Sequence, residues 1–107
     1  MSAEALRAVR NRIAHGWSQD APARDTLGDE VALDSPDARS WTLCSAFALA
    51  GKDGIPMRDL PDALRALAET TGMRTLDGWN NQRGRTKREV LDALDETIAR
   101  VEDLDAA

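Results

Sequence analysis

Apolar residues recur every three or four positions in four stretches of the chain, the spacing that places side chains on one face of an α-helix. The stretches span residues 2–15, 36–50, 57–71 and 86–101. The second is apolar on nearly every face, so we expect it to be the central, buried helix. The pattern therefore predicts a small all-α fold, in which four helices pack as an orthogonal or irregular bundle.

Residues that favour helix ends support these boundaries. Ser35 followed by Pro36 provides a capping side chain and a first helical residue, so we expect the second helix to begin there. Thr86 and Glu89 form a capping box, in which each side chain accepts the other's backbone N–H at the start of the final helix. Gly16 follows the first helix, where a glycine with a positive φ commonly ends the helical turn.

Residues 17–34 have no helical pattern, and Pro22 and Gly28 interrupt them. We predict either a long loop or a short β-hairpin in which residues 23–26 pair with residues 30–33. A loop of this length is usually held down by its own apolar side chains or carries function. The expected anchors are Trp17, Leu27, Val31 and Leu33.

The bulk composition fits one globular domain over residues 1–107, with an acidic tail that we expect to fray from about residue 102. Apolar residues make up 42% and charged residues 31% of the chain, which suits a folded domain rather than a disordered one. The net charge of -5 disfavours general binding to nucleic acid or acidic membranes. A local basic patch remains compatible with it.

Cysteine and histidine counts limit the chemistry. With one cysteine and one histidine, the chain can form neither an internal disulfide nor a zinc site of thiolates and imidazoles. No phosphate-binding glycine loop or other cofactor motif occurs, so we expect no metal and no cofactor. The start of the chain has no apolar signal region, and no stretch approaches the ~20 apolar residues of a membrane span. We expect a cytoplasmic protein without membrane contact.

Cys44 and His15 are the residues from which a nucleophile and its base could be built. Cys44 lies in an apolar helical run without a nearby charge, so burial is expected to raise its pKa and leave it unreactive. His15 occupies the last turn of the first helix, where a cap or a surface position is the simpler interpretation. We therefore expect no catalytic residue and no enzyme.

The stretch "DGWNNQRGRTKREVL" gathers four basic residues at the start of the final helix: Arg83, Arg85, Lys87 and Arg88. Positive charge here opposes the helix dipole, which indicates that it serves another purpose. One interpretation is an anion site, with Trp79 stacking on a base and Asn80 contacting the ligand. The favoured interpretation is structural: Trp79 fills the core, and the arginines pair with acids such as Asp77 or Asp92.

Three blocks, "GWSQDAPARD", "WTLCSA" and "GWNNQRGRTKREVL", resemble a family of small bacterial and phage proteins of unknown function. That family's pattern reads GW-T-Q-G-x-x-A-R-D, then W-C-x-x-G-A, then W-N-D-x-x-G-R-T-x-x-E-V-L. The similarity covers about residues 10–100 and implies no activity. The matching positions are Gly16, Trp17, Gln19, Ala23, Arg24, Asp25, Trp41, Ala46, Trp79, Asn80, Gly84, Arg85, Thr86, Glu89, Val90 and Leu91.

Three positions depart from that family pattern. Thr42, Ser45 and Asn81 stand where the family has cysteine, glycine and aspartate. The resemblance also implies that residues 17–25 and 79–86 belong together, so Asp25 could hold Arg85 in a bidentate ion pair. That pair would be either a structural clasp, which we favour, or the wall of a ligand pocket. The candidate binding residues are Gln19, Arg24, Asp25, Trp79, Asn80, Arg83, Arg85, Lys87 and Arg88.

These observations favour a non-enzymatic domain that binds another protein as an interaction, regulatory or accessory module. The alternative is a domain that binds nucleic acid or a phosphate ligand through the basic residues at 83–88. Salt dependence distinguishes them, because phosphate binding weakens steeply as salt rises.

Overall fold

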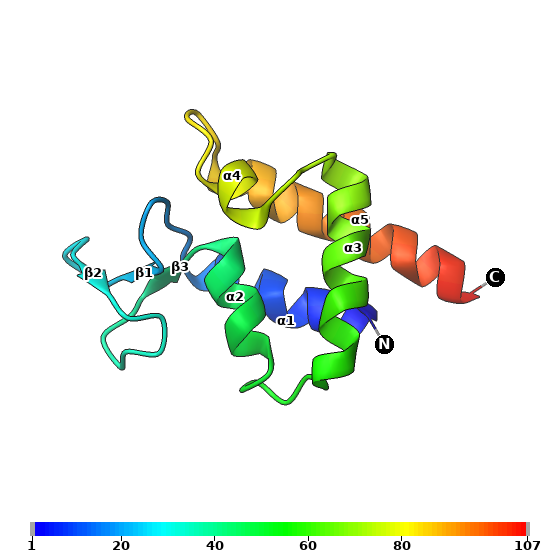
Figure 1. Ribbon diagram of the computed structural model, residues 1–107, viewed down its shortest axis with the longest axis horizontal. Helices are drawn as coiled ribbons and strands as arrows, with labels where there is room; N and C mark the ends of the chain where they lie inside the picture. The colour runs from blue at the N-terminus through cyan, green and yellow to red at the C-terminus, as the bar shows by residue number, and fades with distance from the viewer. Residues whose placement is uncertain (1, 107) are drawn as a thin grey trace.

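The computed structural model describes residues 2–106, with side chains through residue 104, and it is mostly helical with a small sheet at one end (Figure 1). A short 3-10 turn, η1 (Met57–Asp59), leads into the third helix. Within residues 2–106, none of the helices combines the length and apolar content that crossing a membrane requires. The five α-helices of this part of the chain are α1 (Ser2–His15), α2 (Leu43–Ala50), α3 (Leu60–Thr71), α4 (Leu76–Asn80) and α5 (Lys87–Ala106).

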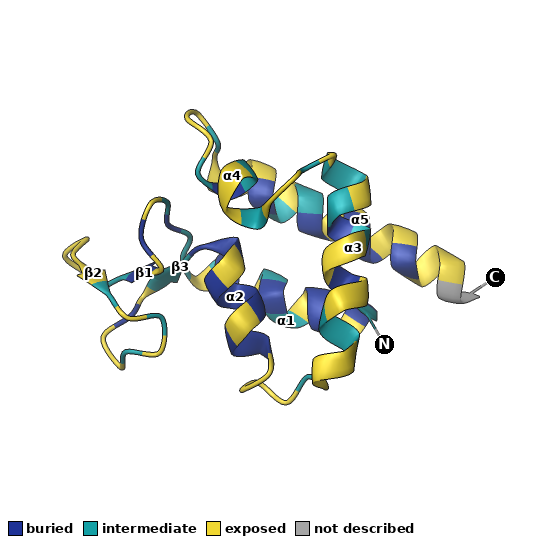
Figure 2. Ribbon diagram, viewed as in Figure 1, coloured by how far each residue is buried: buried dark blue, intermediate teal, exposed yellow. Residues whose placement is uncertain are grey.

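The first helix is the centre of the hydrophobic core. It packs against α2, α3 and α5, and its Leu6, Val9 and Ile13 are fully buried. The expectation that the second helix would be buried is confirmed, because six of the eight residues of α2 are buried. The expectation that it would be central is wrong, because α1 and not α2 packs against the other long helices. Cys44 and Ala48 of α2 face outward and are exposed, as the yellow bands on this helix show (Figure 2).

A three-stranded antiparallel sheet follows α1, so the fold is not purely α-helical. Its strands are β1 (Ala23–Arg24), β2 (Glu30–Val31) and β3 (Ser40–Trp41), in the order β2-β1-β3. The predicted hairpin is confirmed in a shorter form, because Ala23 pairs with Val31 and Arg24 with Glu30, but residues 25–26 and 32–33 lie outside the strands. The third strand is an addition to the prediction: Ala23 also pairs with Trp41.

The second helix begins later than its sequence predicts. Ser35 does cap a turn, because its Oγ accepts the Asp37 N–H at 3.1 Å, but this turn does not continue as a helix. The chain instead enters β3, and α2 begins at Leu43 with Thr42 as its cap. The Arg39 N–H donates to the Arg24 carbonyl of β1, and the Trp41 N–H donates to the Gly16 carbonyl; these non-local hydrogen bonds outweigh the local capping preference.

The last third of the chain contains the short helix α4 and the long final helix α5. Residues 76–80, outside the four predicted helices, form the short helix α4, capped by Thr75. The capping box at α5 is confirmed: Thr86 Oγ1 accepts the Glu89 N–H at 3.1 Å, and Glu89 Oε1 accepts the Thr86 N–H at 3.0 Å. In the structure α5 continues to Ala106, and Glu102 pairs with Arg7 of α1. Fraying of the tail from about residue 102 stays a prediction.

Gly16 is required for close approach rather than for a positive φ, which corrects the expectation from sequence. It is not among the described residues with positive φ. A Cβ atom at this position would lie 2.0 Å from the Arg39 carbonyl oxygen. The Gly16 carbonyl also accepts the Trp41 N–H at 3.0 Å, so the backbones of α1 and β3 meet here.

Replacing Gly16 by alanine should destabilise the protein by about 3 kcal/mol or more, because backbone atoms must move to admit the methyl group. Gly51 is the matched control: it has helical φ and ψ, and a Cβ atom added there would meet open space, with no packed atom within 4 Å. Gly51→Ala should be neutral or stabilise by about 0.4–1 kcal/mol. Urea denaturation measures both, and equal effects of the two substitutions would contradict this packing.

Candidate functional site

Three segments of the chain meet at Asn80, the last residue of α4: the residues that follow α1, the first residue of α2, and the end of α4 itself. The Asn80 side chain is fully buried. Its Oδ1 accepts the indole N–H of Trp17 at 2.7 Å and the Leu43 N–H at 3.1 Å. Its Nδ2 donates to the Ser18 carbonyl at 3.1 Å and to Asn81 Oδ1 at 2.8 Å. One amide thus uses its full hydrogen-bonding capacity to join three segments of the chain.

Further hydrogen bonds extend this junction. Gln19 Nε2 donates to the carbonyls of Asn80 and Gln82, each at 3.0 Å, and Asn81 Oδ1 accepts the Asp20 N–H at 3.0 Å. The prediction that residues 17–25 and 79–86 belong together is therefore confirmed for their contact. We name the set of residues that makes these bonds the Asn80 brace: Trp17, Ser18, Gln19, Asp20, Leu43, Asn80, Asn81 and Gln82.

The predicted ion pair between Asp25 and Arg85 is wrong. Asp25 Oδ1 accepts the backbone N–H groups of Leu27 and Asp29 at 2.9 and 3.0 Å. Arg85 Nε donates to the Trp79 carbonyl at 3.0 Å. Each charged group is used by its own turn, and no ion pair joins the two in the described part of the chain.

Trp79 and Arg85 cover one another. The guanidinium carbon of Arg85 lies 3.9 Å from the centre of the Trp79 ring, and the Arg85 side chain is only 13% exposed. Trp79 is half-buried and packs against the core, as the structural interpretation expected. Arg85 therefore occupies a ring face on which a base would have to stack.

The other basic residues at the start of α5 differ in their freedom. Lys87 Nζ donates to the Ala14 carbonyl at 2.9 Å, at the end of α1. Arg88 lies 3.8 Å from Asp92, in an exposed pair that contributes little to stability. Arg83 is exposed and makes no hydrogen bond or ion pair with any described residue. Of the four cations, only Arg85 is largely covered, and Lys87, although exposed, is engaged by α1.

In the turn between β1 and β2, hydrogen bonds fix the backbone, and the side chain of Leu27 points into solvent. Asp25 and Asp29 are joined by a backbone hydrogen bond of 3.0 Å, and Arg24 Nη1 donates to the Gly28 carbonyl at 3.0 Å. Leu27 is 84% exposed, so the expectation that it anchors the loop is wrong. We call residues 25–29 the Leu27 turn.

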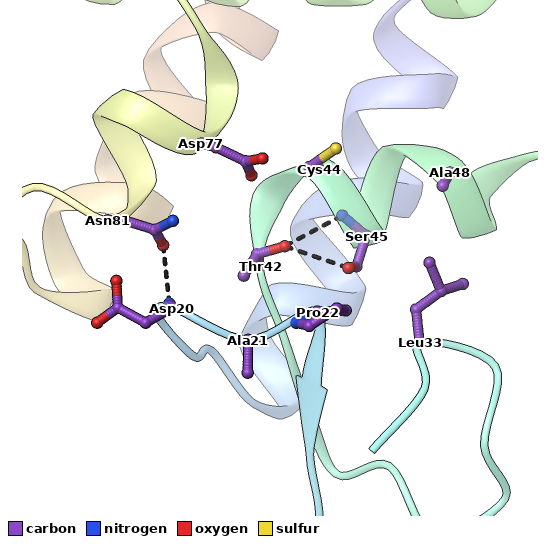
Figure 3. A pocket seen from close by; sticks show the side chains of 10 residues that line it. All are labelled: Asp20, Ala21, Pro22, Leu33, Thr42, Cys44, Ser45, Ala48, Asp77 and Asn81. Atoms are coloured by element: carbon purple, nitrogen blue, oxygen red, sulfur yellow. Dashed lines mark hydrogen bonds between the residues drawn. The ribbon is translucent and has the colours of Figure 1, made fainter. Parts of the chain in front are cut away.

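A cavity of about 290 Å³ lies beside the Asn80 brace, where residues 20–22, α2 and α4 meet (Figure 3). Thr42, Ser45 and Asn81, the three departures from the family pattern, all line it. The sequence patterns did not predict this site. The one indication was that α2 contains no charged residue, even on the face that is turned outward. We call it the α2 cavity.

Cys44 also lines the α2 cavity, and its thiol is exposed rather than buried as expected. Partial burial, and then the nearby Asp77 carboxylate, raise the pKa of the thiol, which is the expected direction. His15 is exposed and lines a separate hollow with Arg12 and Asp53, so no imidazole accompanies the thiol. Among the described residues, no group of three or more His, Cys, Asp or Glu side chains could hold a metal ion.

Comparison with known families places this chain. The profile of a family of unknown function, DUF6197, matches residues 1–100. The chain belongs to this family. The match confirms the resemblance to proteins of unknown function, and DUF6197 membership brings no assigned activity with it. Comparisons with curated proteins and with solved structures give no match.

Replacing Asn80 by alanine should destabilise this DUF6197 chain by about 3 kcal/mol or more, because buried partners in three segments lose their hydrogen bonds. Asn11→Ala is the matched control, since Asn11 is exposed on α1, and it should change stability by less than about 0.5 kcal/mol. Urea denaturation would contradict the role of Asn80 if both variants behaved alike.

Replacing Asp77 by asparagine should lower the pKa of Cys44, because it removes a negative charge that disfavours the thiolate. Burial, the larger cause, remains, so the pKa should stay above its ordinary value. The pH dependence of alkylation by iodoacetamide measures this, and the variant should react faster at pH 8. Asp103→Asn, an exposed change on α5, should leave the profile unaltered; an unaltered profile for Asp77→Asn would refute the assignment.

Proposed function

We propose that this DUF6197 chain is a non-enzymatic cytoplasmic domain that binds another protein through the Leu27 turn. The observation that carries the proposal is a large apolar side chain, 84% exposed, on a turn whose backbone is held by hydrogen bonds to Asp25 and Arg24. The turn lies at the sheet end of the molecule, away from the packed helices (Figure 1).

The energetics of such a turn favour recognition. Transfer of an exposed leucine into an apolar pocket gains about 1.5–3 kcal/mol. A turn that is already ordered loses little conformational entropy when it binds. The neighbouring Asp29 and Glu30 are exposed, so a partner with an apolar socket and a basic rim would fit this surface.

Other features support the remaining parts of the proposal. The thiol of Cys44 lacks a neighbouring imidazole, which argues against a cysteine nucleophile. An exposed free thiol is typical of a reducing compartment, which supports the cytoplasm. An accessory or regulatory role would suit a domain that presents one rigid contact.

Binding of nucleic acid or phosphate through residues 83–88 has less support. Arg85 is held against Trp79 and Lys87 donates to the end of α1, so half of the basic cluster already has a partner within the protein. The remaining two cations, Arg83 and Arg88, are few for a nucleic-acid surface on a chain with a net charge of -5.

Leu27→Ser should reduce recovery of a partner protein from an extract of the native cell by about tenfold, since it removes the apolar side chain that the partner would bury. Leu104→Ser is the matched control, because Leu104 is 77% exposed on α5. The partner should be recovered equally by the wild-type chain and this control, with all three chains equally stable. If every protein recovered by the wild-type chain were also recovered by Leu27→Ser, the proposal would fail.

A further inference from the structure

We propose that the α2 cavity binds a short peptide segment that carries a lysine or arginine side chain beside apolar residues. The cavity is separate from the Leu27 turn, so either proposal can fail without the other. Three features of its lining specify this ligand: two carboxylates without partners, an uncharged helix face and a buried hydroxyl with a free proton.

The carboxylates provide charge complementarity. Asp20 and Asp77 both line the cavity and are exposed. Neither carboxylate makes an ion pair or a hydrogen bond with another side chain or backbone group in the described part of the chain. In Figure 3 the Asp77 side chain extends toward Cys44, across the opening between α4 and α2. The Asp20 carboxylate is turned away from α2, at the margin of the cavity (Figure 3). The unpaired Asp77 charge at the opening, with Asp20 at its margin, favours a cationic ligand and disfavours an anionic one.

The opposite wall is apolar. The helix α2, with the sequence LCSAFALA, contains no charged residue, and its outward Ala48 lines the cavity with Pro22 and Leu33. The volume of about 290 Å³ lies just below the ~300–1,000 Å³ typical of ligand pockets. The space therefore suits one or two side chains of a segment better than a large cofactor.

A buried hydroxyl supplies the third feature. Thr42 Oγ1 donates to Ser45 Oγ at 3.2 Å, and both residues are only 4% exposed. The Ser45 O–H then has no acceptor among the described residues, and it lies in the lining of the cavity. A buried donor without an acceptor is unfavourable, so a ligand carbonyl would be stabilised here. A peptide provides such a carbonyl together with a basic and an apolar side chain.

The test uses a random heptapeptide library displayed on phage and selected against the full chain, followed by synthesis of the enriched peptides. Cys44 is the only cysteine of the chain and lines the cavity, so slower alkylation by iodoacetamide reports occupancy. For each variant, the alkylation rate with peptide is divided by the rate without peptide. This ratio is needed because Asp77 itself affects the pKa of the Cys44 thiol. Unfolding curves check that every variant is folded.

We expect enriched peptides to contain lysine or arginine next to apolar residues and to slow alkylation of Cys44. Asp77→Asn should weaken their binding by about twofold to fivefold, as loss of an exposed ion pair does. Ala48→Arg should abolish binding by filling the cavity with a like charge. Asp103→Asn and Ala99→Arg make the same changes on exposed positions of α5 and should have no effect.

Three results would each overturn the proposal: enriched peptides without a basic residue, peptides that leave the alkylation rate unchanged, or equal binding to Ala48→Arg. Failure to enrich any peptide over the Ala48→Arg variant would overturn it as well. None of these outcomes involves Leu27, so they leave the proposed function of the Leu27 turn to its own test.

Discussion

The buried amide of Asn80 is the interaction on which the polar half of this fold depends. Apolar burial is sufficient to hold α1, α3 and α5 together, but it offers nothing to the backbone groups of the segment between α1 and α2. Asn80 supplies both donors and acceptors at the point where that segment, the start of α2 and the end of α4 converge. A charged or apolar residue could not satisfy all of these partners in a fully buried site.

The brace also determines which groups are available for function. It fixes residues 20–22 beside α2 and α4, and the space between them is the α2 cavity. Arg24 and Asp25 fix the adjoining turn in the same manner. The polar residues that first suggested a binding site therefore mostly hold the backbone, and the groups left exposed at their margins, Leu27 and Asp77, are the better candidates for contact with a partner.

Local signals in the sequence predicted α1, α3, α5 and the capping box, since each depends on residues within one or two turns. They did not predict the start of α2 or the strand β3, because pairing with β1, a distant segment, decides both. For the site, shared motifs indicated that two segments meet. They misassigned the contact between Asp25 and Arg85, because each side chain finds partners nearer in the chain. The cavity depends on the outward face of α2, which periodicity alone did not reveal.

Hydrogen exchange of the tryptophan indole protons, followed by NMR, tests the Asn80 brace most directly. The Trp17 indole donates to Asn80, whereas the Trp79 indole has no hydrogen-bond acceptor in the part of the chain that the structure describes. The account predicts that the Trp17 indole proton exchanges only through global unfolding, as slowly as the amide of the buried Val9. A Trp17 indole proton that exchanges as quickly as that of Trp79 would contradict it.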